Sequence, residues 1–334
     1  MAGDDVEQHG EIRRTRGAPA WLLVLGVAAL VALLVWAGRD DAPSEAAPST
    51  TATSVPSTLP RPLPVLHVVA DTDAGPRPAT TAGAPDAGAA GIAFEALQAT
   101  PITTDGRVVL LVDGGAVLVG RPGGGFAAID LGLPTAALVA SNEPGHVWVV
   151  APRDELALVD LDGIDPPVRI PLGGDRVLGP GTFGVVTVGD DGAVSWRRPS
   201  FDPSLVAVPP GRTALDAGGG SVLVERTRSD DGERTFEVLT VAEGALVGGV
   251  RGESDRPAAL APDGGTVAIP NAEGWTVHDV RSLQAHGSLP AADGDPVWVG
   301  EDRWAVLVDG TVSLSDGTTL SPPWRLRALA EQSP

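Results

Sequence analysis

Short apolar runs alternate with turn residues along the chain from about Ile92 onward. The runs are rich in Val, Leu, Ala and Thr, and Asp-Gly, Gly-Gly and proline-containing segments separate them. None of the runs has the 3.6-residue periodicity of an amphipathic helix, whereas apolar runs bounded by Gly, Asp and Pro are typical of strands and tight turns. The pattern predicts a domain of many short strands over residues 92–334.

These strands recur as a unit in which apolar runs are joined by Asp- or Gly-rich turns. A single blade of a repeat protein cannot bury both faces of its sheet, so blades stack around an axis. Equivalent strands of successive units are about forty residues apart, which is the size of one four-stranded propeller blade. The sequence therefore predicts an all-β fold, a β-propeller of about six four-stranded blades. The second strands are expected to begin at Val108, Val147, Val185, Val222, Val267 and Ala305.

Residues 63–100 leave the number of blades open between six and seven. They could supply a seventh blade or an outer strand that closes the ring, and residues 92–99 are the candidate closing strand. The apolar stretch 63–70 fits a strand docked on the domain as well as it fits a local tether. A pair of β-sandwiches is the alternative architecture, but the constant spacing favours a propeller.

The fifth unit, residues 257–289, shows the repeat most clearly. Its turn Ala261-Pro262-Asp263-Gly264 precedes an apolar strand and resembles the Ser-Pro-Asp-Gly turn of WD-repeat-like and TolB-like propeller blades. The later stretch 276–281 resembles the strand that ends in a Trp-Asp-like dipeptide in those families, with His-Asp in its place. The resemblance implies a propeller but no particular activity, because propellers carry many functions on one scaffold.

Near the N-terminus, residues 17–38 contain no charged side chain. A helix over them would be roughly 33 Å long, close to the thickness of the hydrocarbon core of a bilayer. Trp21 and Trp36 stand near its two ends, where indole rings settle at the membrane interface. We therefore expect one transmembrane helix at residues 20–38. The alternative is a cleaved signal peptide, but the apolar run is longer than a usual signal core.

The flanking charges predict the orientation of this helix. Arg13, Arg14 and Arg16 precede it, whereas Asp40 and Asp41 follow it, and basic flanks stay in the cytoplasm. Residues 1–19 are then a cytoplasmic tail. The C-terminal domain of this single-pass protein of the cell membrane is expected outside the cytoplasm.

Composition separates the helix from the domain and limits the possible partners. Residues 39–91 are rich in Pro, Ala, Ser and Thr, which predicts a disordered linker. The chain has no cysteine, and its net charge is −20. A surface this acidic repels nucleic acid, because phosphate binding requires clustered cations. Neutral or cationic partners are favoured, together with the membrane that holds the N-terminal helix.

Sequence motifs for catalysis or cofactor binding are absent. With neither Lys nor Cys, the chain lacks a P-loop lysine, a Schiff-base lysine and a thiol nucleophile. His146, His278 and His286 show no metal-ligand spacing, so no metal and no cofactor are predicted. Asp160, Asp162 and Asp165 are interpreted as a strand-to-turn junction rather than a calcium loop.

The one irregular interval supplies the candidate binding site. The fourth unit is the longest, and its excess lies in a charged loop between its second and third strands. In a propeller, such turns share a face with the connections between blades, and loops on a rigid scaffold commonly carry binding. The candidate residues on this face are Arg226, Arg228, Asp230, Asp231, Glu233, Arg234, Arg251, Glu253, Asp255, Arg153, Asp154 and Glu155.

Together these features predict a membrane-anchored, extracytoplasmic propeller that acts as a binding or assembly module for an envelope protein or another extracytoplasmic ligand. The alternative is an envelope hydrolase or lyase, with carboxylates at the propeller channel as acid and base. The sequence favours the binding module, because no catalytic signature supports the enzyme.

Overall fold

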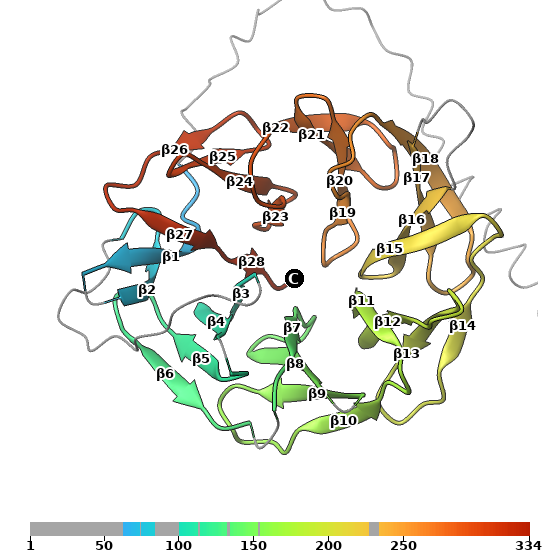
Figure 1. Cartoon of the computed structure of the whole chain (residues 1–334), viewed down its shortest axis with the longest axis horizontal. Coiled ribbons are helices and arrows are strands. Elements are labelled where there is room, and N and C mark those ends of the chain that lie inside the picture. The colour runs from blue at the N-terminus through green and yellow to red at the C-terminus, as the bar shows by residue number, and fades with distance from the viewer. Residues whose placement is uncertain are drawn as a thin grey trace, which may run out of the picture. The chain divides into compact units, whose positions relative to one another are not determined.

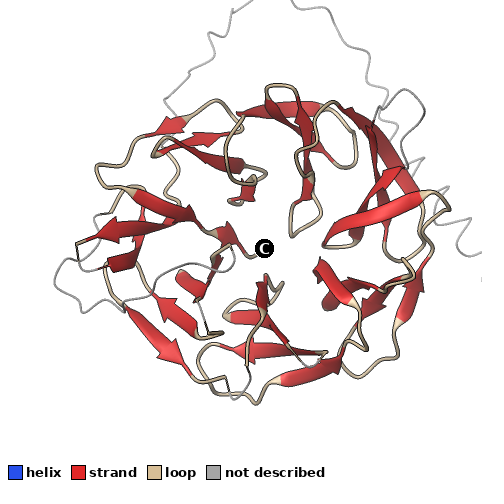
Figure 2. Cartoon of the chain, viewed as in Figure 1, coloured by secondary structure: helices blue, strands red, loops and turns tan. Residues whose placement is uncertain are grey.

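The computed structural model describes residues 63–73, 75–83, 100–112, 114–131, 134–152, 154–226 and 234–334. They belong to one compact unit that begins at Pro62. The predicted tail, the helix at 20–38 with Trp21 and Trp36, and the strand expected at 92–99 lie outside them. The structure therefore lends the transmembrane helix no support. In the described part of the chain every element is a strand (Figure 2), and no helix there is long and apolar enough to cross a bilayer.

Seven small sheets form a ring, with the first strand of each sheet nearest the centre (Figure 1). Blades 2 to 6 are four-stranded and run in chain order from the inner to the outer strand. Blade 1 has four strands in the same arrangement and a fifth strand at its inner edge. Blade 7 has three strands in the described residues.

The strands of blades 1 to 3 are β3 (Ile102–Thr104), β4 (Arg107–Leu111), β5 (Val117–Gly120) and β6 (Phe126–Ile129), then β7 (Ala137–Val139), β8 (His146–Ala151), β9 (Glu155–Asp160) and β10 (Val168–Pro171), then β11 (Arg176–Gly181), β12 (Gly184–Val188), β13 (Val194–Arg197) and β14 (Ser204–Val206). Those of blades 4 to 6 are β15 (Arg212–Gly218), β16 (Ser221–Arg226), β17 (Arg234–Thr240) and β18 (Leu246–Gly252), then β19 (Ala259–Leu260), β20 (Thr266–Asn271), β21 (Gly274–Asp279) and β22 (Ala285–Pro290), then β23 (Val297–Trp298), β24 (Trp304–Val308), β25 (Thr311–Leu314) and β26 (Thr319–Leu320).

Blade 7 closes the ring with strands from both ends of the described chain. Its inner strand β27 (Leu326–Leu329) pairs with β1 (His67–Thr72), which pairs with β2 (Gly75–Thr80). Figure 1 shows red β27 beside blue β1, with β2 on the other side of β1. The last strand, β28 (Glu331–Gln332), then crosses to blade 1 and pairs in parallel with β3. Closure thus fixes both ends of the domain by strand pairing.

The sequence predicted about six blades and left a seventh open. The ring has seven blades. All six predicted second strands exist, and each predicted starting residue is the second residue of its strand. Two of the three described strands of the seventh blade, β1 and β2, lie in the interval 39–91 that composition assigned to the linker. The high content of Pro, Ala, Ser and Thr made this interval look like a linker. Pro76 and Pro78 nevertheless lie in β2, because a strand at the edge of a sheet tolerates proline.

One hydrophobic cluster fills each of the seven interfaces between neighbouring blades. In β8, Val147 and Val149 pack toward blade 1, whereas Trp148 packs toward blade 3. Since successive side chains of a strand point to opposite faces, a strand buried on both faces must be apolar throughout. This is why the second strands were recognisable as continuous apolar runs.

Candidate functional site

The antiparallel blades give the ring two different faces. The turns between second and third strands and the connections between blades lie on one face, here called the connection face. The turns between first and second strands and between third and fourth strands lie on the other, here called the pocket face. Each blade therefore contributes loops to both faces.

The charged loops predicted from the sequence belong to the connection face, but the structure describes them only in part. Arg153, Arg228, Asp230, Asp231 and Glu233 lie outside the described residues. Of the others, Arg226 and Arg234 flank the β16–β17 turn, Arg251, Glu253 and Asp255 lie in or just after β18, and Asp154 and Glu155 lie at the β8–β9 turn.

Arg234 joins two of these three segments. Its Nε lies 2.7 Å from Glu225 Oε1, and its Nη1 donates to the carbonyl oxygens of Ser254 (2.6 Å) and Arg256 (3.1 Å). The Glu225 carboxylate raises the pKa of Arg234. Glu155 belongs to blade 2 and pairs with Arg169 (3.0 Å), so the structure does not bring it to the blade 4 cluster. Ligand binding by these loops stays a prediction.

Other residues noted in the sequence have local structural roles. The carboxylate of Asp160 accepts the N–H groups of Asp162, Ile164 and Asp165, which confirms the turn interpretation and lowers the pKa of Asp160. His278 Nδ1 lies 3.1 Å from the carbonyl oxygen of Leu283.

On the pocket face, backbone and side-chain hydrogen bonds join the inner turns of blades 2 to 5. Asn142 Nδ2 donates to Gly181 O (2.8 Å), Thr182 N to Gly219 O (2.8 Å), and Gly219 N to Pro262 O (2.7 Å). Gly219 has φ 55°, and a Cβ there would lie 2.1 Å from the carbonyl oxygen of Asp263. The close approach of blades 4 and 5 therefore requires glycine at this position.

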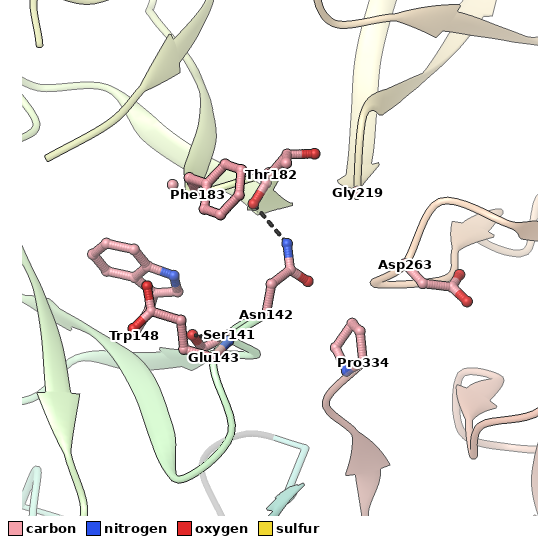
Figure 3. A pocket seen from close by; sticks show the side chains of 11 residues that line it. Ser141, Asn142, Glu143, Trp148, Thr182, Phe183, Gly219, Asp263 and Pro334 are labelled. Carbon is pink, nitrogen blue, oxygen red and sulfur yellow. Dashed lines mark hydrogen bonds between the residues drawn. The ribbon is translucent and has the colours of Figure 1, made fainter.

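These four turns enclose a pocket of about 370 Å³, which residue Pro334 bounds on the side of the ring centre (Figure 3). Its surface is mostly apolar, and Trp148, only 3% exposed, forms part of its wall. Asn142, Glu143 and Asp263 supply polar groups. Small, mostly apolar cavities with a few polar groups are the usual form of ligand sites.

Phe183 stands at the edge of this pocket in an unfavourable conformation. It is the second residue of the two-residue turn between β11 and β12, and its φ is 58°. Glycine or asparagine normally occupies such a position, since a side chain with a branched or bulky Cβ substituent costs free energy there. The side chain is 75% exposed, so core packing does not offset that cost. Strain without a packing benefit points to function.

The exposed apolar side chains of the described chain lie on the same face, in blades 2, 3, 4 and 7. Phe201 and Leu205 follow Phe183 in blade 3, and the guanidinium of Arg198 lies 4.2 Å from the ring centre of Trp196 and 4.7 Å from that of Phe201. Within the described ranges, the large exposed hydrophobic residues lie in turns, in the segment before β1 or in the first two residues of strands on this side: Leu63, Val65, Ile164, Val168, Phe183, Phe201, Leu205 and Leu246. Three of them, Phe183, Phe201 and Leu205, belong to blade 3.

Two carboxylates occupy the centre of the ring. Asp216 sits at a β-bulge of β15, where its two oxygens accept the N–H groups of Ala217 and Leu260, each at 2.8 Å. Burial raises the pKa of Asp216 to about 6. Burial, and then the charge of Asp216, raise the pKa of Glu331 in β28 to about 8. These are the channel carboxylates that the enzymatic alternative requires, but backbone groups hold both oxygens of Asp216.

Sequence reasoning missed the pocket face because its residues come from four separate units. Only Phe183 left a local signal, since an aromatic residue in a two-residue turn between glycines departs from normal turn composition. Trp148 is a buried residue of β8, and nothing in its own segment marks it as part of a pocket wall. Asp216 and Glu331 carry no motif.

No protein-family model matches the chain, and no curated protein matches it. Among solved structures, it is similar to Hsv2 of Kluyveromyces lactis, with 15% identity over 68% of this chain and 83% of that one and a TM-score of 0.40. It is also similar to the β-propeller domain of Cps50 (Swd1) of Myceliophteria thermophila, with 12% identity over 73% of this chain and 91% of that one and a TM-score of 0.49. Likeness at this level carries no argument about function, and the seven-bladed fold rests on the strand pairing above.

Proposed function

We propose that the propeller is a binding module and that its partner docks on the pocket face, around Phe183. The observation that carries this is the strained, 75% exposed Phe183 beside a pocket of about 370 Å³. Partner residues anchored in a pocket supply most of the free energy of binding at protein interfaces. The hydrogen-bonded turns of blades 2 to 5 keep the pocket preformed, which lowers the entropic cost of binding.

Photo-crosslinking distinguishes this face from the charged loops of the connection face. A benzophenone amino acid is placed at Phe183 in one variant and at Arg226 in a second, and adducts are identified after irradiation of intact cells. A partner captured from position 183 but not from position 226 is the expected result. Capture from position 226 alone would instead support the loop site and contradict the pocket face.

We also propose that the module is held at the cell membrane, outside the cytoplasm, by a helix at residues 20–38. The uncharged stretch 17–38 and the arginines at its N-terminal side support this. The test is extraction of cell membranes at alkaline pH, followed by protease treatment of intact cells. Retention of the chain in the membrane and digestion of the propeller from outside are expected. Release by alkaline extraction contradicts the anchor.

The enzymatic alternative would have to use Asp216 and Glu331. Both oxygens of Asp216 are engaged by backbone N–H groups, and Glu331 lies in a strand that pairs with β3. These contacts favour a structural role for the pair, so the binding module is the function that the geometry supports best.

A further inference from the structure

The chemistry of the pocket identifies the kind of segment it would bind, and this inference rests on the proposed function. Glu143 and Asp263 come from the inner turns of blades 2 and 5 and stand on different sides of the pocket (Figure 3). Both residues are exposed. Asp263 Oδ1 accepts the N–H of Gly265 (2.8 Å), and neither carboxylate forms an ion pair within the described part of the chain. Two negative charges at the pocket therefore lack counter-charges there.

The arginines of the same face are already engaged or lie outside the pocket lining. Arg107 Nη1 is 2.7 Å from Asp162 Oδ1, and Arg303 pairs with Glu301. The guanidinium of Arg198 lies against the rings of Trp196 and Phe201. With a chain charge of −20 behind them, Glu143 and Asp263 keep the pocket mouth negative. A cationic group would be attracted to this mouth, and an anionic group repelled.

Size and apolar lining restrict the ligand further. A pocket of about 370 Å³ is near the small end of the range for ligand sites, so it suits one or two side chains rather than a large cofactor. Trp148 in the wall and Phe183 at the edge favour an apolar group inside the pocket. The exposed ring of Phe183 can also interact with a cation through its π face.

We propose that the pocket binds a segment of a partner protein in which an apolar side chain is followed by arginine or lysine. The apolar side chain fills the pocket against Trp148. The neighbouring cation lies between Glu143, Asp263 and the ring of Phe183. The rest of the partner covers the exposed apolar residues of blade 3, which include Phe201 and Leu205.

The test measures binding of three fluorescent, end-capped hexapeptides to the full chain in mild detergent. Each peptide has one leucine, followed by arginine, glutamine or glutamate, in a Gly/Ser background. The arginine peptide is expected to bind tightest and the glutamate peptide weakest. Glu143→Gln and Asp263→Asn should each lower the preference for arginine over glutamine by about twofold to fivefold, the range for exposed charge pairs. Added salt should reduce the same preference.

Glu243→Gln is the matched control, because it removes one exposed carboxylate from a blade 4 turn on the same face, away from the pocket. Its preference for arginine should equal that of the unchanged chain. If the arginine and glutamine peptides bind equally, the proposed preference for a cation is wrong. If Phe183→Asn then weakens the binding of both peptides, the proposed binding function still holds. If argininamide alone binds as tightly as the arginine peptide, the proposal that the pocket binds a segment of a partner protein is wrong. Failure of all three peptides to bind would count against both proposals.

Discussion

The carboxylates of Glu331 and Asp216 share the centre of the ring, although they come from strands at opposite sides of it. Burial raises the pKa of Glu331 to about 8, and the charge of Asp216 contributes to that shift. A carboxyl group with a raised pKa in the folded state binds more protons than it does in the unfolded chain. Its contribution to stability is therefore present below pH 4.5, its ordinary pKa, and is lost as the pH rises toward about 8.

We predict that the free energy of unfolding falls between pH 5 and pH 8, by up to about 1.4 kcal/mol per pH unit from this one group. Urea unfolding at several pH values measures it. Glu331→Gln should flatten the curve and raise stability at pH 8. Glu243→Gln, which changes an exposed carboxylate, should leave the curve as it was. An unchanged slope in the Glu331 variant would contradict the assignment.

Arg234 is expected to stabilise the fold more than the other charged residues of the predicted loop site. Its ion pair with Glu225 is bidentate and largely buried, and it also binds two carbonyl oxygens. Arg234→Ala should cost about 2–4 kcal/mol, because it removes a bidentate, largely buried partner of Glu225 and a donor to both carbonyl oxygens. Arg169→Ala removes a pair whose arginine is 49% exposed and should cost less than about 1 kcal/mol. Equal losses in urea unfolding would show that Arg234 has no special role.

Val68 tests the closure of the ring by β1. It is fully buried between blades 6 and 7, so Val68→Ala should lower the free energy of unfolding by about 2 kcal/mol through the cavity it leaves. Val65→Ala, three residues earlier at a 58% exposed position, should be neutral within about 0.5 kcal/mol. A chain shortened to residues 92–334 should fail to unfold cooperatively, since blade 7 would keep only β27. Cooperative unfolding of that shortened chain would contradict the closure.

Val68 also shows how far the sequence could predict the fold. The repeat was visible wherever a second strand is buried on both faces, because such strands are apolar throughout. Val68 is the equivalent residue of the seventh unit, but the first strand of that unit, β27, lies at the other end of the chain. A search for a contiguous unit cannot find a blade that is divided in this way.

The pocket could not be predicted for a different physical reason. Asn142, Phe183 and Asp263 become neighbours only when blades 2 to 5 close around the axis, and no spacing in the sequence encodes that approach. The charged loop before Arg234 was noticeable because it interrupts the repeat within one unit. Length irregularity marks a loop, whereas a pocket formed by short turns of regular length leaves no such mark.

Phe183 connects stability with binding, and its replacement should separate the two. Asparagine tolerates positive φ far better than phenylalanine, and the ring has few packing contacts to lose. Phe183→Asn should therefore raise the free energy of unfolding by about 1 kcal/mol. The same variant should lose capture of the partner and bind the arginine peptide more weakly. Leu246→Ala, which removes another exposed apolar side chain from the same face, should leave peptide binding unchanged. A variant at position 183 that is more stable and still captures the partner would mean that the strained turn does not serve binding.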